Sequence, residues 1–297
     1  MNIEKWLKKN TTSLKGKTIA ITGSSGDIGK QTCYILASLG ANLIFLNRNE
    51  NKSRELKEEL LDLNNDIFVD YINVDFENFK SVKNALVELD KYDLDILIVN
   101  AGAYKVDRRI SDIGYDNVFQ INFISPYFLI KKTMEKMRLK HSGKVVVVSS
   151  IAHNYSCLNE LDIDYKKEKK QSKVYGNSKR FLTFSLYELF KNEKEIELSI
   201  VHPGITLTNM TGHFPKPIYW MMKYPMKWIF ISNKKAALNI ILGVFKSCNY
   251  KYWIGPKIFN VWGYPKYKLL NTVSKDESES IYKISEKIYI ENKDINL

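Results

Sequence analysis

Short apolar runs alternate along the chain with longer segments in which apolar residues recur every three or four positions. The short runs are rich in Val, Ile and Leu, and several are apolar nearly throughout, which is typical of strands covered on both faces. The longer segments have the periodicity of amphipathic helices. This alternation predicts βαβ units, and therefore an α/β fold: a Rossmann-type doubly wound parallel sheet of about seven strands with helices on both faces.

Strands are expected at residues 18–22, 42–46, 67–73, 95–99, 144–149, 197–202 and 252–254. Helices are expected at residues 27–39, 53–63, 79–89, 115–138, 172–191 and 234–245. Gly40 directly after the first helix suits a helix C-terminus, because glycine readily adopts the left-handed conformation that ends many helices. No linker rich in Pro, Gly or Ser divides the chain, so we predict a single domain over residues 1–297.

The formal net charge is +12, and only six of the 45 basic residues are arginines. A lysine-rich solvated surface accounts for most of this excess. Residues 198–275 are different, since they contain no Asp or Glu but eleven lysines and four of the five tryptophans. Charge without a recognisable motif does not indicate nucleic-acid binding, so no nucleic-acid partner is predicted.

The cysteines Cys33, Cys157 and Cys248 lie far apart and form none of the close pairs that metal or redox sites use. We therefore predict no metal site and a reduced, cytoplasmic environment. Residues 1–17 are polar and lysine-rich and lack the apolar centre of a secretory signal. No apolar run approaches the roughly 20 residues of a membrane-spanning helix, so the sequence predicts neither export nor a membrane span.

A glycine-rich turn follows the first predicted strand and opens the first predicted helix, with the sequence Thr22-Gly23-Ser24-Ser25-Gly26-Asp27-Ile28-Gly29. Gly23 permits a tight turn and Gly29 a close approach of helix and strand, while N–H groups at the helix start bind a pyrophosphate. The turn predicts a dinucleotide site made by Gly23, Ser24, Ser25, Asp27, Ile28 and Gly29.

The end of the second predicted strand bears on which dinucleotide binds. An acid at this place binds the ribose hydroxyls of NAD, but here the residues are Asn47-Arg48-Asn49. No carboxylate is present to repel a 2'-phosphate, and the planar guanidinium of Arg48 can neutralise one. NADP(H) is therefore favoured over NAD(H), the alternative being that Arg48 is an ordinary surface residue.

Tyr175 and Lys179 lie four positions apart on a predicted helix, so their side chains share one face. A free phenol has a pKa of about 10, and a nearby ammonium group lowers that pKa by stabilising the phenolate. The pair therefore suits Tyr175 to general acid/base chemistry.

Further motifs follow in a fixed order. They are Asp75-Phe76 after the third strand, Asn100-Ala101-Gly102 after the fourth, Asn122 in the long helix, Ser150 after the fifth strand, Tyr175-Gly176-Asn177-Ser178-Lys179, and His202-Pro203-Gly204-Ile205-Thr206-Leu207-Thr208. Together with the glycine turn, they make the chain resemble the short-chain dehydrogenase/reductase superfamily, in its classical branch, over about residues 15–256.

The resemblance implies an oxidoreductase that interconverts an alcohol and a carbonyl with NAD(P). Ser150 would bond the substrate oxygen, Tyr175 would exchange its proton, and Lys179 would bind the nicotinamide ribose while tuning Tyr175. Asn122 would hold a water that links Lys179 to solvent. The resemblance assigns the remaining cofactor contacts to Asp75, Phe76, Asn100, Ala101, Gly102, Pro203, Gly204, Ile205 and Thr208.

One glycine departs from the family pattern. The classical branch has its middle glycine at the position of Asp27, whereas this chain has it one place earlier, at Gly26. The resulting spacing resembles the superfamily's extended branch. Asp27 suits a helix N-terminus electrostatically but lies near the expected pyrophosphate, so its effect on cofactor affinity stays open.

Ser150 and Tyr175 are widely spaced, and Ser149-Ser150-Ile151-Ala152-His153 begins the segment between them. Both features resemble the retinol-dehydrogenase-like group, which implies a lipophilic alcohol, aldehyde or ketone as substrate. His153 is a further acid/base candidate, although a loop histidine outside the core set is more often structural. Two alternatives stay open: a reductase of small polar ketones or sugars, and a non-catalytic nucleotide-binding scaffold.

Residues 205–232 occupy the place of the family's substrate lid, and residues 257–297 form a C-terminal extension. The lid is rich in aromatic residues and Met, including Trp220 and Trp228, with Lys216, Lys223 and Lys227 beside them. Such residues suit the lining of an apolar pocket and peripheral contact with an anionic membrane. A homo-oligomer and a membrane-resting monomer both stay open.

Overall fold

The computed structural model describes residues 2–155, 157–206, 231–270 and 272–294. Its strands are β1 (Thr18–Thr22), β2 (Asn42–Asn47), β3 (Val69–Asn73), β4 (Ile96–Val99), β5 (Gly143–Val148), β6 (Ile196–Val201), β7 (Tyr252–Ile258) and β8 (Trp262–Leu269). Its helices are α1 (Ile3–Asn10), α2 (Asp27–Ser38), α3 (Glu50–Leu63), α4 (Phe79–Leu89), α5 (Asn117–Phe119), α6 (Ser125–Leu139), α7 (Gln171–Leu189), α9 (Asn233–Phe245) and α10 (Lys275–Lys293), with a π-helical turn η1 (Gln120–Ile124) and a 3-10 turn η2 (Ile151–Asn154).

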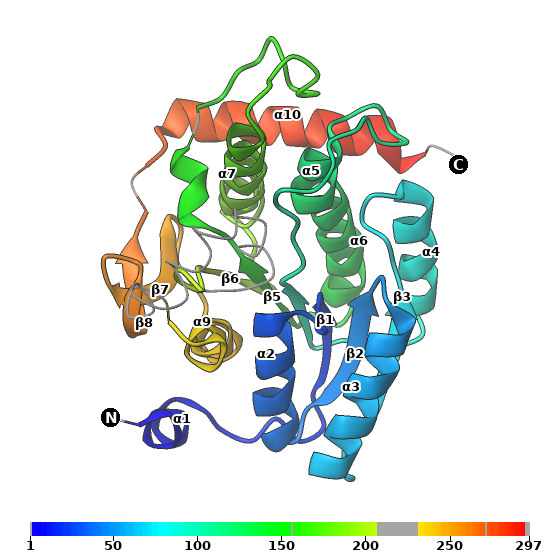
Figure 1. Cartoon of the computed structure of the whole chain (residues 1–297), viewed down its shortest axis with the longest axis vertical. Helices are drawn as coiled ribbons and strands as arrows, with labels where there is room; N and C mark the ends of the chain where they lie inside the picture. Colours follow the sequence, from blue (N-terminus) through cyan, green and yellow to red (C-terminus); the bar gives the residue numbers. More distant parts are fainter. Residues whose placement is uncertain (1, 156, 207–230, 271, 295–297) are drawn as a thin grey trace, which may run out of the picture.

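The strands form one sheet in the order β3-β2-β1-β4-β5-β6-β7-β8 (Figure 1). Neighbouring strands from β3 to β7 are parallel, and β8 runs antiparallel to β7. Strand order reverses between β1 and β4, so the chain winds outward in both directions from this point. The predicted Rossmann-type, doubly wound fold is confirmed, with one strand more than the seven expected from the sequence pattern.

Helices cover both faces of the sheet, and the side chains of the central strands alternate between them. Ile19 and Ile21 pack into one apolar cluster with α2, α3 and α9, whereas Ala20 packs into the other with α4, α6, α7 and α10. In β5, Val145 packs into the same cluster as Ala20, and Val146 packs into the same cluster as Ile19 and Ile21. Because both faces are buried, these strands appear in the sequence as continuous apolar runs.

The long helix predicted at 115–138 is interrupted by η1. Asn122 lies inside this turn, and its Nδ2 donates to the carbonyl oxygens of Val118 (2.7 Å) and Ala103 (2.8 Å). The Ser125 N–H bonds to the carbonyl of Gln120, a spacing of five residues in place of the four of an α-helix. The Asn122 side chain thus bonds the Val118 carbonyl, which in an α-helix would accept from the Asn122 backbone N–H. This competition accounts for the widened turn.

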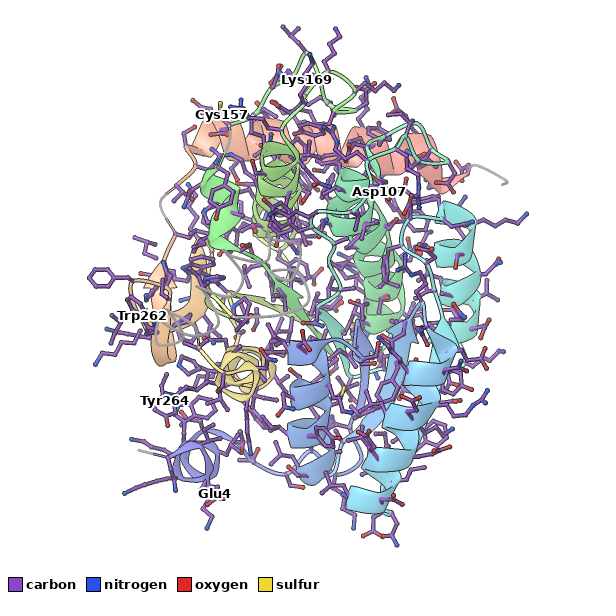
Figure 2. The ribbon with its side chains drawn as sticks, in the orientation of Figure 1. Glu4, Asp107, Cys157, Lys169, Trp262 and Tyr264 are labelled. Carbon is purple, nitrogen blue, oxygen red and sulfur yellow. The ribbon has the colours of Figure 1, made fainter. Side chains whose placement is uncertain are left out.

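Two elements that the sequence pattern does not predict, α1 and β8, lie side by side. The Asn2 side chain caps α1 by accepting a hydrogen bond from the Lys5 N–H. The buried Trp6 of α1 stacks on Tyr264 of β8, with ring centroids 6.3 Å apart. Figure 2 shows Tyr264 on the same side of the molecule as Glu4 of α1. Helix α1 therefore packs against the edge strand of the sheet through these two rings.

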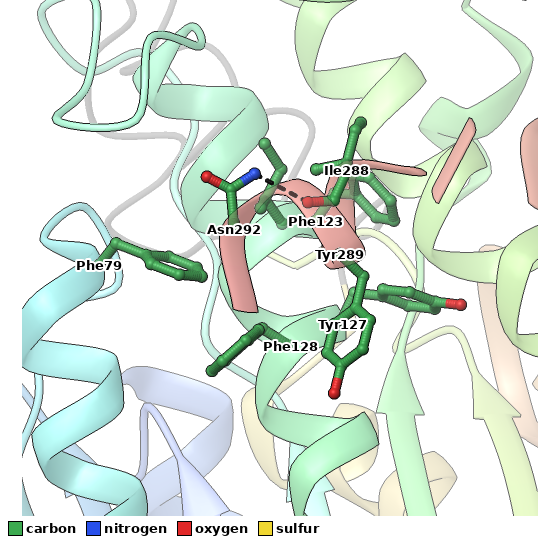
Figure 3. A pocket seen from close by; sticks show the side chains of 8 residues that line it. Phe79, Phe123, Tyr127, Phe128, Ile288, Tyr289 and Asn292 are labelled. Atoms are coloured by element: carbon green, nitrogen blue, oxygen red, sulfur yellow. Dashed lines mark hydrogen bonds between the residues drawn. The ribbon is translucent and has the colours of Figure 1, made fainter. Parts of the chain in front are cut away.

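Helix α10, also absent from the predicted elements, crosses α6 and α7 and completes the core there (Figure 1). Ile281 and Ile288 are buried in the same cluster as Ala20, and the ring of Tyr289 lies 5.5 Å from that of Phe128 (Figure 3). Much of the predicted C-terminal extension thus supplies an edge strand and a core helix. Neither α10 nor another helix in the described residues is long and apolar enough to cross a membrane.

Candidate active site

The predicted site residues gather at the carboxyl edge of the sheet, where β1, β4 and β5 end. Strand order reverses here, and the loops on the two sides separate, so a doubly wound sheet has its binding crevice at this place. Gly23 follows β1, Asn100 follows β4, and Ser150 comes shortly after β5. Helix α7 carries Tyr175 and Lys179.

The turn after β1 depends on Gly23 and Gly29. Gly23 has a φ of +66°, and a Cβ there would lie 2.9 Å from the Cα of Ala101. A Cβ on Gly29 would lie 2.1 Å from the Gly23 carbonyl oxygen. Gly26 has a φ of −78°, and the nearest atom to a Cβ there would be 3.4 Å away. The geometry therefore requires the outer glycines and leaves room for a side chain at the displaced middle one.

Helix α2 begins directly after this turn, with Gly26 as its N-cap. The first N–H groups of a helix have no carbonyl partner within the helix, and the helix dipole favours an anion there. Ile28 and Gly29 lie in this first turn, so the helix start fits a pyrophosphate. Asp27 places a carboxylate in the same turn, which favours the helix and opposes the bound anion.

Asn100 and Thr22 bind the loops after β1 and β4 to each other. Asn100 Nδ2 donates to the carbonyl oxygens of Thr22 (3.1 Å) and Gly23 (3.0 Å). The Thr22 hydroxyl accepts from the N–H groups of Asn100 (2.9 Å) and Ala101 (2.8 Å). These bonds hold the glycine turn in position relative to β4.

Asn47 at the end of β2 holds Ser24 of the glycine turn. Its Nδ2 donates to the hydroxyl oxygens of Ser24 (2.6 Å) and Ser53 (2.9 Å), and all three side chains are buried. The Ser24 hydroxyl is thus engaged within the protein, while Ser25 beside it is half-buried. No local sequence pattern indicates the contact, because the three partners come from different segments.

Arg48 and Asp75 face each other across the ends of β2 and β3. The distance from Arg48 Nη1 to Asp75 Oδ2 is 4.0 Å, and the Arg48 side chain is 72% exposed. At this distance the guanidinium keeps donors available to a second anion. Phe76, to which the resemblance also assigns a cofactor contact, is buried among core side chains.

Gly102, Asn122 and Lys179 meet beyond the end of β4. A Cβ on Gly102 would lie 2.8 Å from Asn122 Oδ1 and 3.5 Å from Lys179 Nζ. The Ala103 N–H donates to Asn122 Oδ1 (3.1 Å), and Lys179 Nζ donates to the carbonyl of Val148 (3.1 Å). The structure thus brings together predicted residues from the β4 loop, η1 and α7.

Tyr175 lies beside Ser150 and Lys179. The Ser150 side chain acts to lower the pKa of the Tyr175 hydroxyl, and Lys179 Nζ lies 6.0 Å from the centre of the Tyr175 ring. Burial raises the pKa of Tyr175 to about 12 and lowers the pKa of Lys179 to about 8. The direction for Tyr175 is opposite to the lowering expected from the sequence, because loss of water disfavours the phenolate more than its neighbours support it.

Two tyrosines outside the sequence motifs border Tyr175. The ring of Tyr104 lies 4.9 Å from that of Tyr175. A Cβ on Gly176 would lie 3.0 Å from the Cβ of Tyr155, whose side chain is exposed. Tyr104 comes two positions after Gly102, and this closeness is the sequence signal that could have identified it. Tyr175 is therefore bordered by two further tyrosines.

The histidines near the site are buried and stay neutral. His153 Nδ1 bonds to the Ser150 carbonyl (2.6 Å) and its Nε2 to the Thr272 hydroxyl (2.9 Å), and burial lowers the pKa of His153 to about 4. His202 stacks on Trp253 at 5.2 Å, and burial lowers its pKa to about 3. His153 therefore supports the backbone of Ser150 and does not suit acid/base work near neutral pH.

The segment after β6 leads to the predicted lid. Gly204 has a φ of +90°, and a Cβ there would lie 2.8 Å from Ile231 and 3.0 Å from Pro256. The Ile231 N–H donates to the Ile205 carbonyl (3.0 Å), so the two ends of the predicted lid meet. Thr208 and the lid residues 207–230 lie outside the described residues.

Known proteins share the sequence pattern. The family model for short chain dehydrogenases matches residues 17–217. The short-chain dehydrogenase TIC 32 A, chloroplastic, of Brassica napus is 29% identical over 213 residues, which cover 67% of this chain and 67% of the relative. Retinol dehydrogenase 13 of Homo sapiens is 24% identical over 233 residues, which cover 76% of this chain and 70% of the relative.

Solved structures share the fold. An uncharacterized protein from Mycobacterium Paratuberculosis matches with a TM-score of 0.74 at 18% identity, over 95% of this chain and 96% of that chain. A metagenomic short-chain oxidoreductase in complex with NADP matches with a TM-score of 0.57 at 19% identity, over 80% of this chain and 93% of that chain. By its sequence match and its fold, this chain belongs to the short-chain dehydrogenase family, is similar to the retinol dehydrogenases within it, and is an oxidoreductase of alcohols and carbonyls that uses NAD(P).

Proposed function

We propose that this chain interconverts a lipophilic alcohol and its carbonyl compound with NADP(H), using Tyr175 as the general acid/base. The observation that carries the proposal is the convergence of Asn122, Ser150, Tyr175 and Lys179 at one edge of the sheet. These residues come from η1, the loop after β5, and α7. Purified protein should oxidise NADPH in the presence of a lipophilic aldehyde or ketone, and spectrophotometry at the nicotinamide absorbance measures this.

In the reductive direction, the nicotinamide supplies a hydride when bound. Tyr175, with a pKa of about 12, is protonated near neutral pH and donates its proton to the substrate oxygen. Ser150, whose side chain acts on the pKa of Tyr175, donates to the same oxygen. Lys179 is charged below its pKa of about 8, and this charge stabilises the phenolate that forms when Tyr175 gives up its proton. Asn122 holds the loop after β4 beside Lys179.

Two features support NADP(H) as the cofactor. Arg48 presents an exposed guanidinium at the end of β2, and the residues on either side of it are the uncharged Asn47 and Asn49. The nearest carboxylate to its Nη1, on Asp75, is 4.0 Å away. Arg48 therefore has the charge and the freedom to bind a 2'-phosphate.

Arg48→Asp is expected to reduce the preference for NADPH over NADH by about tenfold or more, because a repulsive charge replaces the phosphate partner. The ratio of kcat/KM for the two cofactors, in both proteins, measures the change. Arg54→Asp makes the same charge change on a nearby exposed arginine that pairs with Glu50, and it should leave the ratio as it is. A wild-type preference for NADH would contradict the role given to Arg48.

The charge state of Lys179 predicts a pH dependence for the reduction. With a pKa lowered to about 8, Lys179 carries its charge below that pH and loses it above. The kcat/KM for reduction should therefore be level below pH 7 and fall as the pH rises through about 8. Lys179→Met should be slower at every pH and lack this transition. If wild type and variant show the same profile, the charge of Lys179 has no part in the reaction.

The surroundings of Tyr175 support a lipophilic substrate. The Tyr104 ring lies beside that of Tyr175, and Tyr155 lies next to Gly176. Aromatic rings bind apolar ligands while their hydroxyls stay in water. A relative of this chain is named retinol dehydrogenase. We propose that the substrate's chain runs along these two tyrosines, with its oxygen between Ser150 and Tyr175.

Two other functions are distinguished by direct measurements. A reductase of small polar ketones or sugars would give a higher kcat/KM with such compounds than with a long-chain aldehyde. A non-catalytic scaffold would bind NADPH without consuming it, and retention of Ser150, Tyr175 and Lys179 in one cluster argues against this reading. The cytoplasmic location and a homo-oligomeric state stay predictions, of which sedimentation of the purified chain tests the second.

A further inference from the structure

We propose that the β7–β8 hairpin docks on anionic lipid membranes and places the entrance of the active site at the bilayer surface. We name as the hairpin face the hairpin's exposed tip together with the neighbouring lysines of α1 and α9: Lys5, Lys8, Lys9, Lys234, Lys235, Lys257, Ile258, Phe259 and Lys266. The membrane contact expected from the sequence rested on Lys216, Lys223 and Lys227, which lie outside the described residues. The hairpin face is made of other residues, all of them described.

The hairpin tip exposes apolar side chains. Phe259 is 83% exposed and Ile258 is 48% exposed. The tight turn that carries them has positive φ at Phe259 and Asn260 and is closed by a bond from the Val261 N–H to the Ile258 carbonyl (2.9 Å). Exposed apolar surface gains free energy on leaving water, so this tip favours an apolar phase.

The tip is held in shape by bonds to the rest of the fold. Lys268 Nζ donates to the Pro256 carbonyl (2.6 Å) and to Asn260 Oδ1 (2.8 Å). The Asn260 carbonyl also bonds to the Nε2 of the buried His202 (3.0 Å). Because the turn is already ordered, docking through it loses little conformational freedom.

Positive charge surrounds the tip. Lys257 and Lys266 are exposed on the hairpin, and the chain has no Asp or Glu between residues 198 and 275. This charge continues onto the neighbouring helices. The Nζ of Lys235 in α9 lies 5.4 Å from the centre of the Tyr264 ring in β8, on which Trp6 of α1 also stacks.

Helix α1 adds further charge to the same side. It exposes Lys5, Lys8 and Lys9 against one acid, Glu4. Figure 2 shows Trp262 and Tyr264 of the hairpin on the same side of the molecule as Glu4. Lysines near an anionic bilayer add their attractions, so the hairpin and α1 together form a docking surface of net positive charge.

The hairpin that carries this face adjoins the two ends of the predicted lid. Gly204 packs closely against Pro256 of the hairpin and against Ile231 at the end of the predicted lid. Docking would therefore bring both ends of the lid to the membrane, and a lipophilic substrate would reach Tyr175 without crossing bulk water. This consequence rests on the proposed function, whereas membrane binding itself does not.

A bilayer fits the face better than a nucleic acid does. Single-stranded nucleic acids are bound by flat aromatic rings on which bases stack, whereas the tip pairs Phe259 with the aliphatic Ile258. An interfacial segment combines lysines at the headgroups with apolar side chains that enter the acyl boundary. The hairpin face has both parts.

Co-sedimentation of the full chain with vesicles tests the proposal. Vesicles of phosphatidylcholine with phosphatidylserine should pellet the wild-type protein, and vesicles of phosphatidylcholine alone should pellet much less. Lys257→Glu/Lys266→Glu should weaken binding to the anionic vesicles about tenfold or more, and high salt should have a similar effect. Phe259→Ser should weaken chiefly the binding that survives high salt.

Matched variants on distant helices serve as controls. Lys52→Glu/Lys80→Glu changes two exposed lysines of α3 and α4, and Leu139→Ser changes a side chain at the end of α6 that is 82% exposed. All three exposed positions should tolerate the change and keep wild-type vesicle binding. The proposal is overturned if the wild-type protein stays in the supernatant with anionic vesicles at low salt, or if these controls lose as much binding as the hairpin variants. It is also overturned if single-stranded DNA or RNA retains the protein and anionic vesicles do not. None of these readings depends on turnover, so they stand whether or not the proposed activity is found.

Discussion

Tyr175→Phe is expected to lower kcat about a thousandfold while the dissociation constant for NADPH stays nearly unchanged. The substitution removes only the Tyr175 hydroxyl, the group that exchanges the proton in the proposed mechanism. The ring keeps its place beside Tyr104, whose ring centroid is 4.9 Å away. Single-turnover consumption of NADPH measures the chemical step, and fluorescence titration measures binding.

The matched control is Tyr104→Phe, which removes a hydroxyl from the neighbouring ring. The Tyr104 hydroxyl has no part in the proposed proton transfer, so this variant should keep most of the wild-type kcat. If the two variants lost kcat equally, the polarity of the two tyrosine hydroxyls, and not proton transfer from Tyr175, would account for the loss. A Tyr175→Phe protein with the wild-type rate would remove Tyr175 from the mechanism.

Gly29→Ala is expected to abolish measurable NADPH binding and to destabilise the fold by about 1–3 kcal/mol, the cost of overpacking. The added carbon would lie 2.1 Å from the Gly23 carbonyl oxygen and 3.0 Å from Asn100 Nδ2. Both neighbours belong to the turn and its support, so α2 must move away from the strands. Calorimetric titration with NADPH and thermal unfolding measure the two effects.

Gly26→Ala is the comparison within the same turn. Its φ of −78° suits any residue, and an added Cβ has 3.4 Å to its nearest neighbour. This variant should therefore fold normally and keep NADPH affinity within a few-fold. If Gly26→Ala were as damaging as Gly29→Ala, the displaced glycine would matter through the cofactor's approach, since the protein's own atoms leave it room.

The parts of the fold that can be predicted from the sequence are those with local causes. The strand β4 is apolar throughout, and β1 is apolar between its two terminal threonines, because both faces of the sheet are buried. The glycine turn follows β1 directly. The approach of Tyr175 and Lys179 follows from helical spacing. Their meeting with Ser150 depends on the family's strand order, and the sequence indicates it only through the resemblance.

What the sequence does not predict depends on distant contacts or on burial. The π-helical turn arises because Asn122 bonds Val118 and Ala103, and nothing in the helix pattern signals that second partner. Helix α1 is short and polar, and it is placed by the stacking of Trp6 on Tyr264. The pKa of Tyr175 is raised because burial removes water from around its hydroxyl. The spacing of residues along a helix does not indicate how deeply a side chain is buried.

Helix α10 affects the order in which the protein matures during translation. It buries Ile281 and Ile288 against the cluster that includes α6 and α7, and Glu286 accepts hydrogen bonds from Lys131 and Tyr127 of α6. Arg180 of α7, itself buried, finds its carboxylate partner in Glu277 of α10. The ribosome makes α10 after every strand of the sheet. A nascent chain with a finished sheet therefore still exposes the apolar side chains of α6 and α7 that α10 covers, and Arg180 still lacks its carboxylate partner. The helix that carries Tyr175 therefore reaches its final packing only after α10 has left the ribosome, and until then the chain offers chaperones an exposed surface to bind.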